Sequence, residues 1–94
     1  MAYARVGLTG LVDDALNMTS ANVTHPTTGL YCISGLSFTP KNVQVTPQYF
    51  GSTASAYLGN YGGCPTAQIS VNEMTDGGGS PDTQRDSPFM ILIN

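Results

Sequence analysis

The sequence predicts an all-β domain, a small antiparallel β-sandwich or jelly-roll-like fold with one disulfide. Three observations lead to this prediction. Short apolar or alternating runs recur about every ten residues with turn residues between them, which is typical of a sandwich or barrel. Helix patterns are nearly absent, and the best one, at residues 12–18, is short and interrupted by acidic and amide residues. Cys32 and Cys64 each lie in or beside a β-type run. A chain of 94 residues is expected to form a single domain, residues 1–94.

The first half of the chain predicts three strands. Residues 3–8 alternate between small or apolar and other side chains, the period of a half-buried strand. Residues 22–25 form a short strand that Pro26 is expected to end. A turn with Pro and Gly chemistry follows, because Pro presets φ and Gly permits positive φ. Residues 29–34 are then a strongly apolar strand.

The second half predicts three further strands before the last run. Residues 42–46 alternate cleanly, with both valines expected to point inward. Residues 54–58 are a weaker strand candidate between two glycines. Residues 68–74 alternate again, with Ile69 and Val71 expected to point inward. The Gly- and Asp-rich stretch 76–87 is the clearest loop of the chain.

The last run, residues 89–93, is apolar at every position. Such a run is typical of a strand that is buried on both faces. Because chain ends usually fray, a fully apolar end needs a cover, either from the centre of the domain or from a partner subunit. The candidate interface residues are Phe89, Met90, Ile91, Leu92 and Ile93.

The two cysteines, Cys32 and Cys64, indicate a disulfide that pins two strands of a small secreted domain. Disulfides persist in oxidising compartments and are common where a small core gives little stability. We therefore expect an extracellular protein. The alternative is a cytosolic protein with two free, buried cysteines.

The charge composition argues against two classes of partner. The chain carries three Lys and Arg against six Asp and Glu residues. Three scattered cations do not form the cluster that neutralises nucleic-acid phosphates or holds an anionic membrane surface. Nor does any apolar stretch approach the ~20 residues of a membrane-spanning helix. We expect neither a nucleic-acid nor a membrane partner.

Residues suited to catalysis or metal binding are few. His25 is the only histidine, and it lies in a predicted turn, where a structural or surface role is expected. Glu73 and the loop aspartates are expected to be solvated. The aspartates of residues 76–87 supply oxygen atoms suited to calcium, but their spacing does not match an EF-hand loop, so calcium stays open. We predict no enzyme activity and no cofactor.

Aromatic residues in a stretch rich in Gly, Ser and Ala are the best candidates for ligand contact. Exposed aromatics among small polar residues stack on sugars or anchor protein contacts. The alternative is that they seal the core beneath a loop. The candidate ligand-contact residues are Tyr49, Tyr57, Asn60 and Tyr61.

Four segments of the chain are residues 22–33, residues 38–43, the Cys64-Pro65 pair and residues 87–94. Together they resemble a family of small, poorly characterised bacterial domains, chiefly from actinobacteria and their relatives. Domains of this family often end secreted proteins, sometimes after collagen-like Gly-X-Y repeats. The resemblance implies a β-rich terminal head, paired cysteines and trimerisation at the end of a stalk. This sequence contains no Gly-X-Y repeat.

These observations predict a non-enzymatic extracellular structural or interaction module that self-associates, with a trimeric head of a stalk or fibre as the expected form. The alternative is a carbohydrate- or surface-binding module that uses the loop tyrosines.

Overall fold

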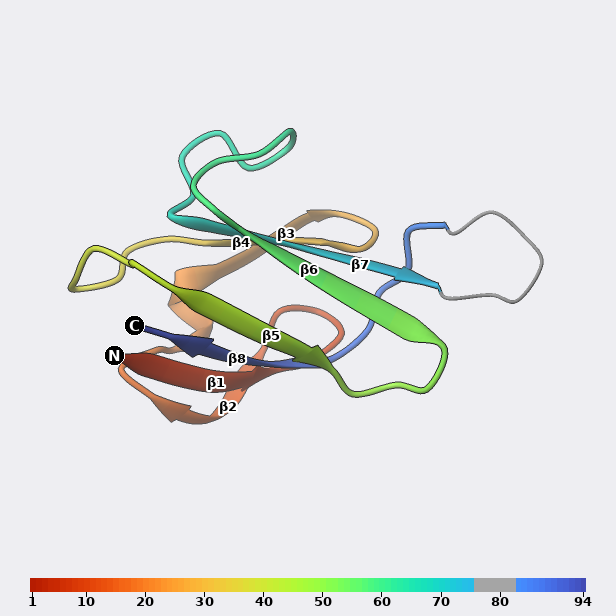
Figure 1. Cartoon of the computed structure of the whole chain (residues 1–94), viewed down its shortest axis with the longest axis horizontal. Helices are drawn as coiled ribbons and strands as arrows, with labels where there is room; N and C mark the ends of the chain where they lie inside the picture. Colours follow the sequence, from red (N-terminus) through yellow and green to blue (C-terminus); the bar gives the residue numbers. More distant parts are fainter. Residues whose placement is uncertain (76–82) are drawn as a thin grey trace.

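The computed structural model of the protein describes residues 1–75 and 83–94. It contains two four-stranded antiparallel sheets packed face to face (Figure 1). This arrangement, with a disulfide between Cys32 and Cys64, confirms the predicted small antiparallel sandwich. Within the described ranges no helix is long and apolar enough to cross a membrane.

Each sheet has two central and two edge strands. The first sheet has the order β2-β1-β8-β5, with bounds Val12–Leu16, Ala2–Val6, Phe89–Ile93 and Val43–Pro47. The second sheet has the order β3-β4-β7-β6, with bounds Val23–Thr27, Leu30–Ile33, Ile69–Thr75 and Ser52–Leu58. One short 3₁₀ helix, Ser20–Asn22, precedes β3.

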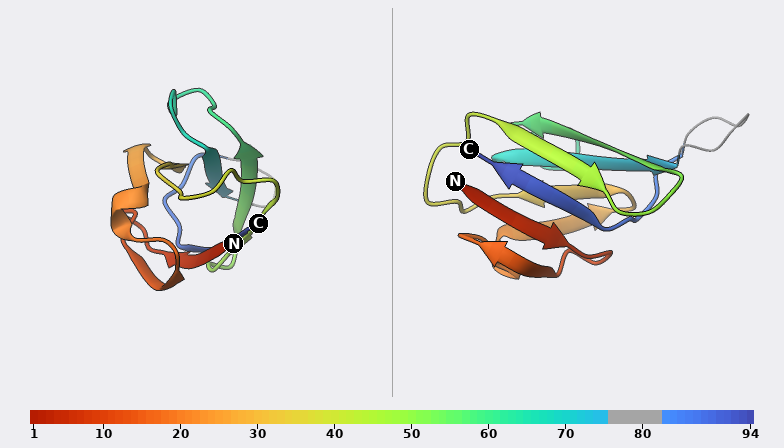
Figure 2. Two further views of the ribbon diagram at one scale, coloured as in Figure 1. Left: turned by 90° about the vertical axis from the view of Figure 1, so that its left-hand side faces the viewer. Right: turned by 60° about the horizontal axis from the view of Figure 1, so that its bottom comes forward.

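The first and last strands pair side by side in the middle of the first sheet. Ala2 lies opposite Ile93 and Val6 lies opposite Phe89 in an antiparallel ladder. The two chain ends therefore lie next to each other at one end of the sandwich (Figure 2). The C-terminal run is thus covered by neighbouring strands on both sides, β1 and β5.

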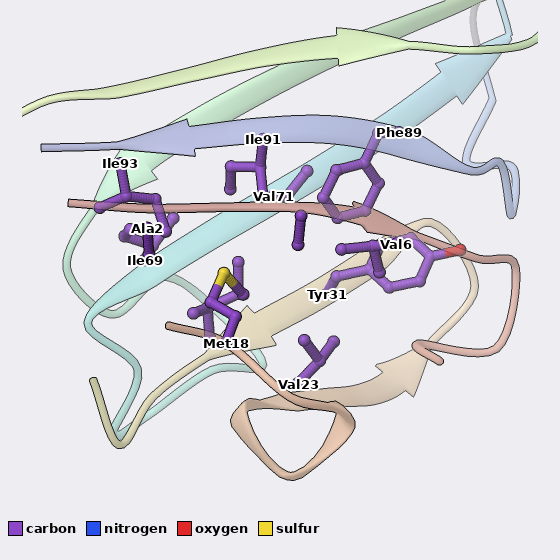
Figure 3. Close-up of a cluster of buried hydrophobic side chains, with 12 residues drawn as sticks. Ala2, Val6, Met18, Val23, Tyr31, Ile69, Val71, Phe89, Ile91 and Ile93 are labelled. Carbon is purple, nitrogen blue, oxygen red and sulfur yellow. The ribbon is translucent and has the colours of Figure 1, made fainter. Parts of the chain in front are cut away.

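The core fills the space between the two sheets (Figure 3). Side chains alternate along a strand, so every second residue of β1, β7 and β8 points into this space. A fully buried Val, Ile or Phe side chain contributes about 1.5–3 kcal/mol. The buried members are Ala2, Ala4, Val6, Met18, Val23, Tyr31, Ile33, Ile69, Val71, Phe89, Ile91 and Ile93.

The stretch with the best helix pattern in the sequence is a strand. β2 pairs with β1, but the register shifts between Tyr3 and Arg5, which marks a β-bulge. Asp14 within the strand and Asn17 just after it have positive φ values of 46° and 59°. Asp and Asn tolerate this conformation better than other non-glycine residues. The polar residues that interrupt the helix pattern are therefore the ones that bend an edge strand.

Pro26 does not end its strand, as the sequence analysis expected. β3 continues through Pro26 to Thr27. The pairing with β4 shifts register between Thr24 and Thr27, so Pro26 lies in a bulge of an edge strand. Proline is tolerated there because the missing N–H leaves no ladder bond broken.

Candidate functional site

The disulfide fastens a loop to the outer surface of the second sheet. Cys32 lies on β4 and Cys64 lies in the loop between β6 and β7, with Cα atoms 5.5 Å apart. Both cysteines are buried, and they form a small apolar cluster with Leu30, against which Ala67 packs. This loop stands above the sheet at the top of Figure 1. The predicted disulfide is confirmed, but it joins a strand to a loop, whereas the sequence analysis expected it to join two strands.

Hydrogen bonds within the β6–β7 loop hold it in one conformation. The Cys64 N–H donates to the Tyr61 carbonyl (2.7 Å) and the Gly59 N–H donates to the Gln68 carbonyl (2.7 Å). The Asn60 side-chain amide donates to the Pro65 carbonyl (2.8 Å). Asn60, a candidate ligand contact, therefore uses one of its two amide N–H groups to hold the loop.

Tyr57 and Tyr61 form an exposed aromatic pair beside this loop. Their ring centroids are 5.8 Å apart and the planes are inclined by 52°. Tyr57 is 55% and Tyr61 is 60% exposed. They border a pocket of about 240 Å³, whose other lining residues are Leu30, Ser55, Ala56, Ser70 and Asn72.

Tyr49 does not belong to this pair. It lies in the turn between β5 and β6, whereas Tyr57 is close to the opposite end of β6. Tyr57 lies five residues after Ser52 on β6, a separation of about 17 Å at ~3.3 Å per residue. The Arg85 guanidinium lies over the Tyr49 ring, 5.4 Å from its centroid. The structure therefore brings together two of the three candidate tyrosines.

Sequence reasoning missed two of the polar residues that line the pocket, Ser55 and Asn72. They face each other across β6 and β7. Alternation along residues 68–74 would have placed Asn72 outward, but the sequence carries no signal for the register that sets it against Ser55. The pocket depends on that register.

The outer face of the first sheet is the second candidate surface. Phe89, Ile91 and Ile93 point into the core, so the C-terminal run is not buried on both faces as the sequence analysis expected. Met90 is 43% exposed and Leu92 is half-buried on the opposite side of β8. The second sheet covers only one side of the first sheet, so alternate residues of β8 face outward. A shallow pocket of about 320 Å³ lies over this face, lined by Tyr3, Gln44, Thr46, Met90, Ile91 and Leu92.

His25 is part of a structural link. Its ring stacks on Tyr31, and its Nε2 lies 2.9 Å from Asp86 Oδ1. Its Nδ1 lies 2.7 Å from the Leu30 carbonyl oxygen. Both neighbours are acceptors, so both ring nitrogens donate when the imidazole is protonated. With both nitrogens engaged, His25 joins β3 to the segment before β8.

Two other titrating groups belong to this link. The Gly29 N–H donates to Asp86 Oδ1 (2.8 Å), and this bond, with the bond and charge of His25, lowers the pKa of Asp86. Burial raises the pKa of Tyr31 to about 12. The Tyr31 hydroxyl donates to the Leu8 carbonyl (2.8 Å).

Glu73 is buried, which contradicts the expectation that it is solvated. It follows Ile69 and Val71 on the inward side of β7, and its side chain has no exposed surface. Neither carboxyl oxygen has a hydrogen-bond partner in the described part of the chain. Burial raises the pKa of the Glu73 carboxyl to about 7. Alternation from Ile69 and Val71 already points position 73 inward, so the expectation of a solvated Glu73 followed from its charge and not from its place in the strand.

The aspartates of residues 76–87, which the sequence analysis left open as calcium ligands, are only partly within the described residues. Asp76 and Asp82 lie outside the described residues. Among residues 1–75 and 83–94, no group of three or more His, Cys, Asp or Glu side chains is placed to hold a metal ion.

Among residues 1–75 and 83–94, the tyrosine pocket and the outer face of the first sheet are two surfaces suited to binding. Neither a protein-family model, nor a curated protein, nor a solved structure matches this chain.

Proposed function

We propose that the domain is a non-enzymatic extracellular interaction module that self-associates through the outer face of its first sheet. The observation that carries the proposal is a row of apolar side chains across three strands. Leu16 lies opposite Tyr3, and Tyr3 lies opposite Leu92. Leu16 and Tyr3 are 42% and 43% exposed. Rows of exposed apolar side chains on a sheet favour contact with another protein surface.

The adjacent row adds both signs of charge. Arg5 lies opposite Asp13 on β2 and opposite Met90 on β8. The Arg5 Nη1 is 3.3 Å from Asp13 Oδ2. A face that carries a cation and an anion side by side can meet a second copy of itself without opposing like charges.

The rest of the composition favours close packing between copies. Lys is depleted at protein interfaces relative to other surfaces. The only lysine, Lys41, lies in the loop before β5, where its N–H donates to the Asn94 carbonyl (2.6 Å). The disulfide supports the extracellular setting, since such bonds persist mainly outside the reducing cytosol.

A trimer is the stoichiometry that we propose, following the family resemblance of residues 22–33 and 87–94. Three copies that meet at an apolar face would form the head of a stalk or fibre. Light scattering coupled to gel filtration tests the stoichiometry. We expect a mass of three 9.8-kDa chains.

Sedimentation of two variants, from low micromolar to millimolar protein, tests the surface. Leu92→Lys places a charge in the apolar row and is expected to give monomers. Thr53→Lys is the matched control, because Thr53 is exposed on β6 of the other sheet and the variant should keep the wild-type mass. A wild-type protein that is monomeric throughout this range contradicts the proposal. Equal dissociation of both variants places the interface elsewhere.

A further inference from the structure

The pocket beside Tyr57 and Tyr61 is rigidly built. Tyr57 comes from β6, while Tyr61 comes from the loop that the disulfide fastens to β4. Gly63 of this loop lies so close to Leu30 that an added Cβ would be 2.9 Å from Leu30 Cδ2. Because covalent and packing contacts hold the loop, its backbone places Tyr61 beside Tyr57 before any ligand arrives. A preorganised site loses less entropy on binding.

The floor of the pocket offers polar groups that are free to bind. Within the described residues, no hydrogen bond engages the Asn72 side-chain amide or the Ser55 hydroxyl, which face each other across the strands. Ser70 lies two residues before Asn72 on the same face of β7. Its hydroxyl donates to the Gly59 carbonyl (2.9 Å) and keeps lone pairs free to accept. An amide and two hydroxyls together supply donors and acceptors within one small area.

The lining carries no charged side chain, which selects a neutral ligand. Its residues are aromatic, aliphatic, hydroxyl or amide in character. A volume of about 240 Å³ is below the ~300–1,000 Å³ of pockets for drug-sized ligands, and suits a single ring. Sugar rings combine an apolar C–H face, which packs on aromatic faces, with hydroxyls that both donate and accept.

We propose that this pocket binds one ring of a neutral carbohydrate. The tyrosine rings pack against the C–H face of the sugar, and Asn72 and Ser55 hydrogen-bond its hydroxyls. The site lies on the second sheet, so the proposal stands or falls independently of self-association through the first.

Native gels that contain neutral polysaccharides test the proposal with the whole chain, using galactomannan, xyloglucan, laminarin and dextran in separate gels. We expect at least one to retard the protein. Tyr61→Ala and Tyr57→Ala should each weaken retardation roughly tenfold, because each removes an aromatic face. Tyr61→Phe should retain most of the binding. Asn72→Ala should weaken it severalfold.

The controls separate loss of the site from loss of the fold. Tyr49→Ala removes an exposed tyrosine at the far end of β6 and should bind like the wild type. Because Tyr61 lies in a loop and is 60% exposed, its variants should unfold at the wild-type temperature.

Three outcomes would overturn the proposal. One is the absence of retardation in every gel. Another is unchanged binding by Tyr57→Ala and Tyr61→Ala. The third is an NMR titration in which tetramethylammonium shifts the signals of Tyr57 and Tyr61 but oligosaccharides of the four tested polysaccharides do not. That result would mean that the tyrosine pair binds a cation and not a sugar.

Discussion

The imidazole of His25 lies flat on the phenol ring of Tyr31, with centroids 4.3 Å apart and 7° between the planes. Tyr31 in turn meets Phe89 edge to face at 5.1 Å. The stack therefore runs from an edge strand of the second sheet to a central strand of the first. Asp86 closes it by binding both His25 and the turn at Gly29.

Removing the Asp86 carboxylate should loosen this link. Asp86→Ala is expected to lower the free energy of unfolding by about 1 kcal/mol at neutral pH, a value discounted because the side chain is 40% exposed. The folded pKa of Asp86 lies below the usual 3.8, so its contribution is present above that value and is lost as the pH falls through the folded pKa. Urea unfolding at several pH values measures the effect.

Asp86→Asn serves as the companion variant. Its amide oxygen can still accept the Gly29 N–H, but the negative charge facing His25 is gone. We expect a smaller loss of stability than for Asp86→Ala. A loss as large as that of the alanine variant would show that the charge, and not the bond to Gly29, provides the stabilisation.

The buried carboxyl of Glu73 should make the domain more stable in mild acid than in base. Its folded pKa is about 7 against 4.5 for the free group. The stability that the domain has with a protonated Glu73 carboxyl is thus fully present below pH 4.5, and it is lost as the pH rises through 7. The difference of about 2.5 pKa units corresponds to about 3 kcal/mol less stability above pH 8.

Two variants test this assignment. Glu73→Gln should be close to the wild type at pH 5 and about 3 kcal/mol more stable than it above pH 8. Glu73→Met should be at least as stable at both pH values, because it also removes the unpartnered polar atoms. Urea midpoints that fall equally with pH in wild type and both variants would rule out Glu73 as the titrating group.

The disulfide should matter for both stability and the tyrosine pocket. It closes a loop with a sequence separation of 32 residues, for which chain entropy gives roughly 3–4 kcal/mol. The double variant Cys32→Ser with Cys64→Ser is expected to unfold at correspondingly lower urea concentration. It should also bind saccharide more weakly, since Tyr61 loses its anchor. Wild-type binding by a folded double variant would mean that the loop holds its shape without the bridge.

Gly29 should resist any side chain. Its φ is +77°, and an added Cβ would lie 2.5 Å from the Glu73 carbonyl oxygen and 3.0 Å from the Arg85 nitrogen. Gly29→Ala therefore combines backbone strain with overlap and is expected to lose about 3 kcal/mol. Gly62→Ala is the matched control, since Gly62 has φ +43° and open space around it. It should lose only about 1 kcal/mol, as thermal unfolding can measure.

Local patterns were enough to predict the fold class. The apolar run at residues 29–34 and the alternation at residues 42–46 and 68–74 correspond to β4, β5 and β7. The pairing of Cys32 with Cys64 was the only intramolecular choice open to two cysteines. The alternation of apolar residues and the local composition are properties of a few neighbouring residues, so they can be recognised without knowing how the rest of the chain folds.

The candidate sites depended on contacts that no local pattern records. Met90 and Leu92 are as apolar as their neighbours, yet they face outward because the other sheet covers one side only. Ser55 joins Asn72 only through the register of β6 against β7. These positions follow from long-range pairing, which a single sequence does not reveal.

The adjacency of the two chain ends has a mechanical consequence. Tension applied between them would pull β1 and β8 apart like a zipper, parting Ala2 from Ile93 first and Val6 from Phe89 last. Each rung would bear the load alone instead of sharing it with the others, so the domain would yield at low force when stretched by its own ends. A force that is applied at one chain end and passes to a bound partner would not pull directly on the pairing of β1 with β8.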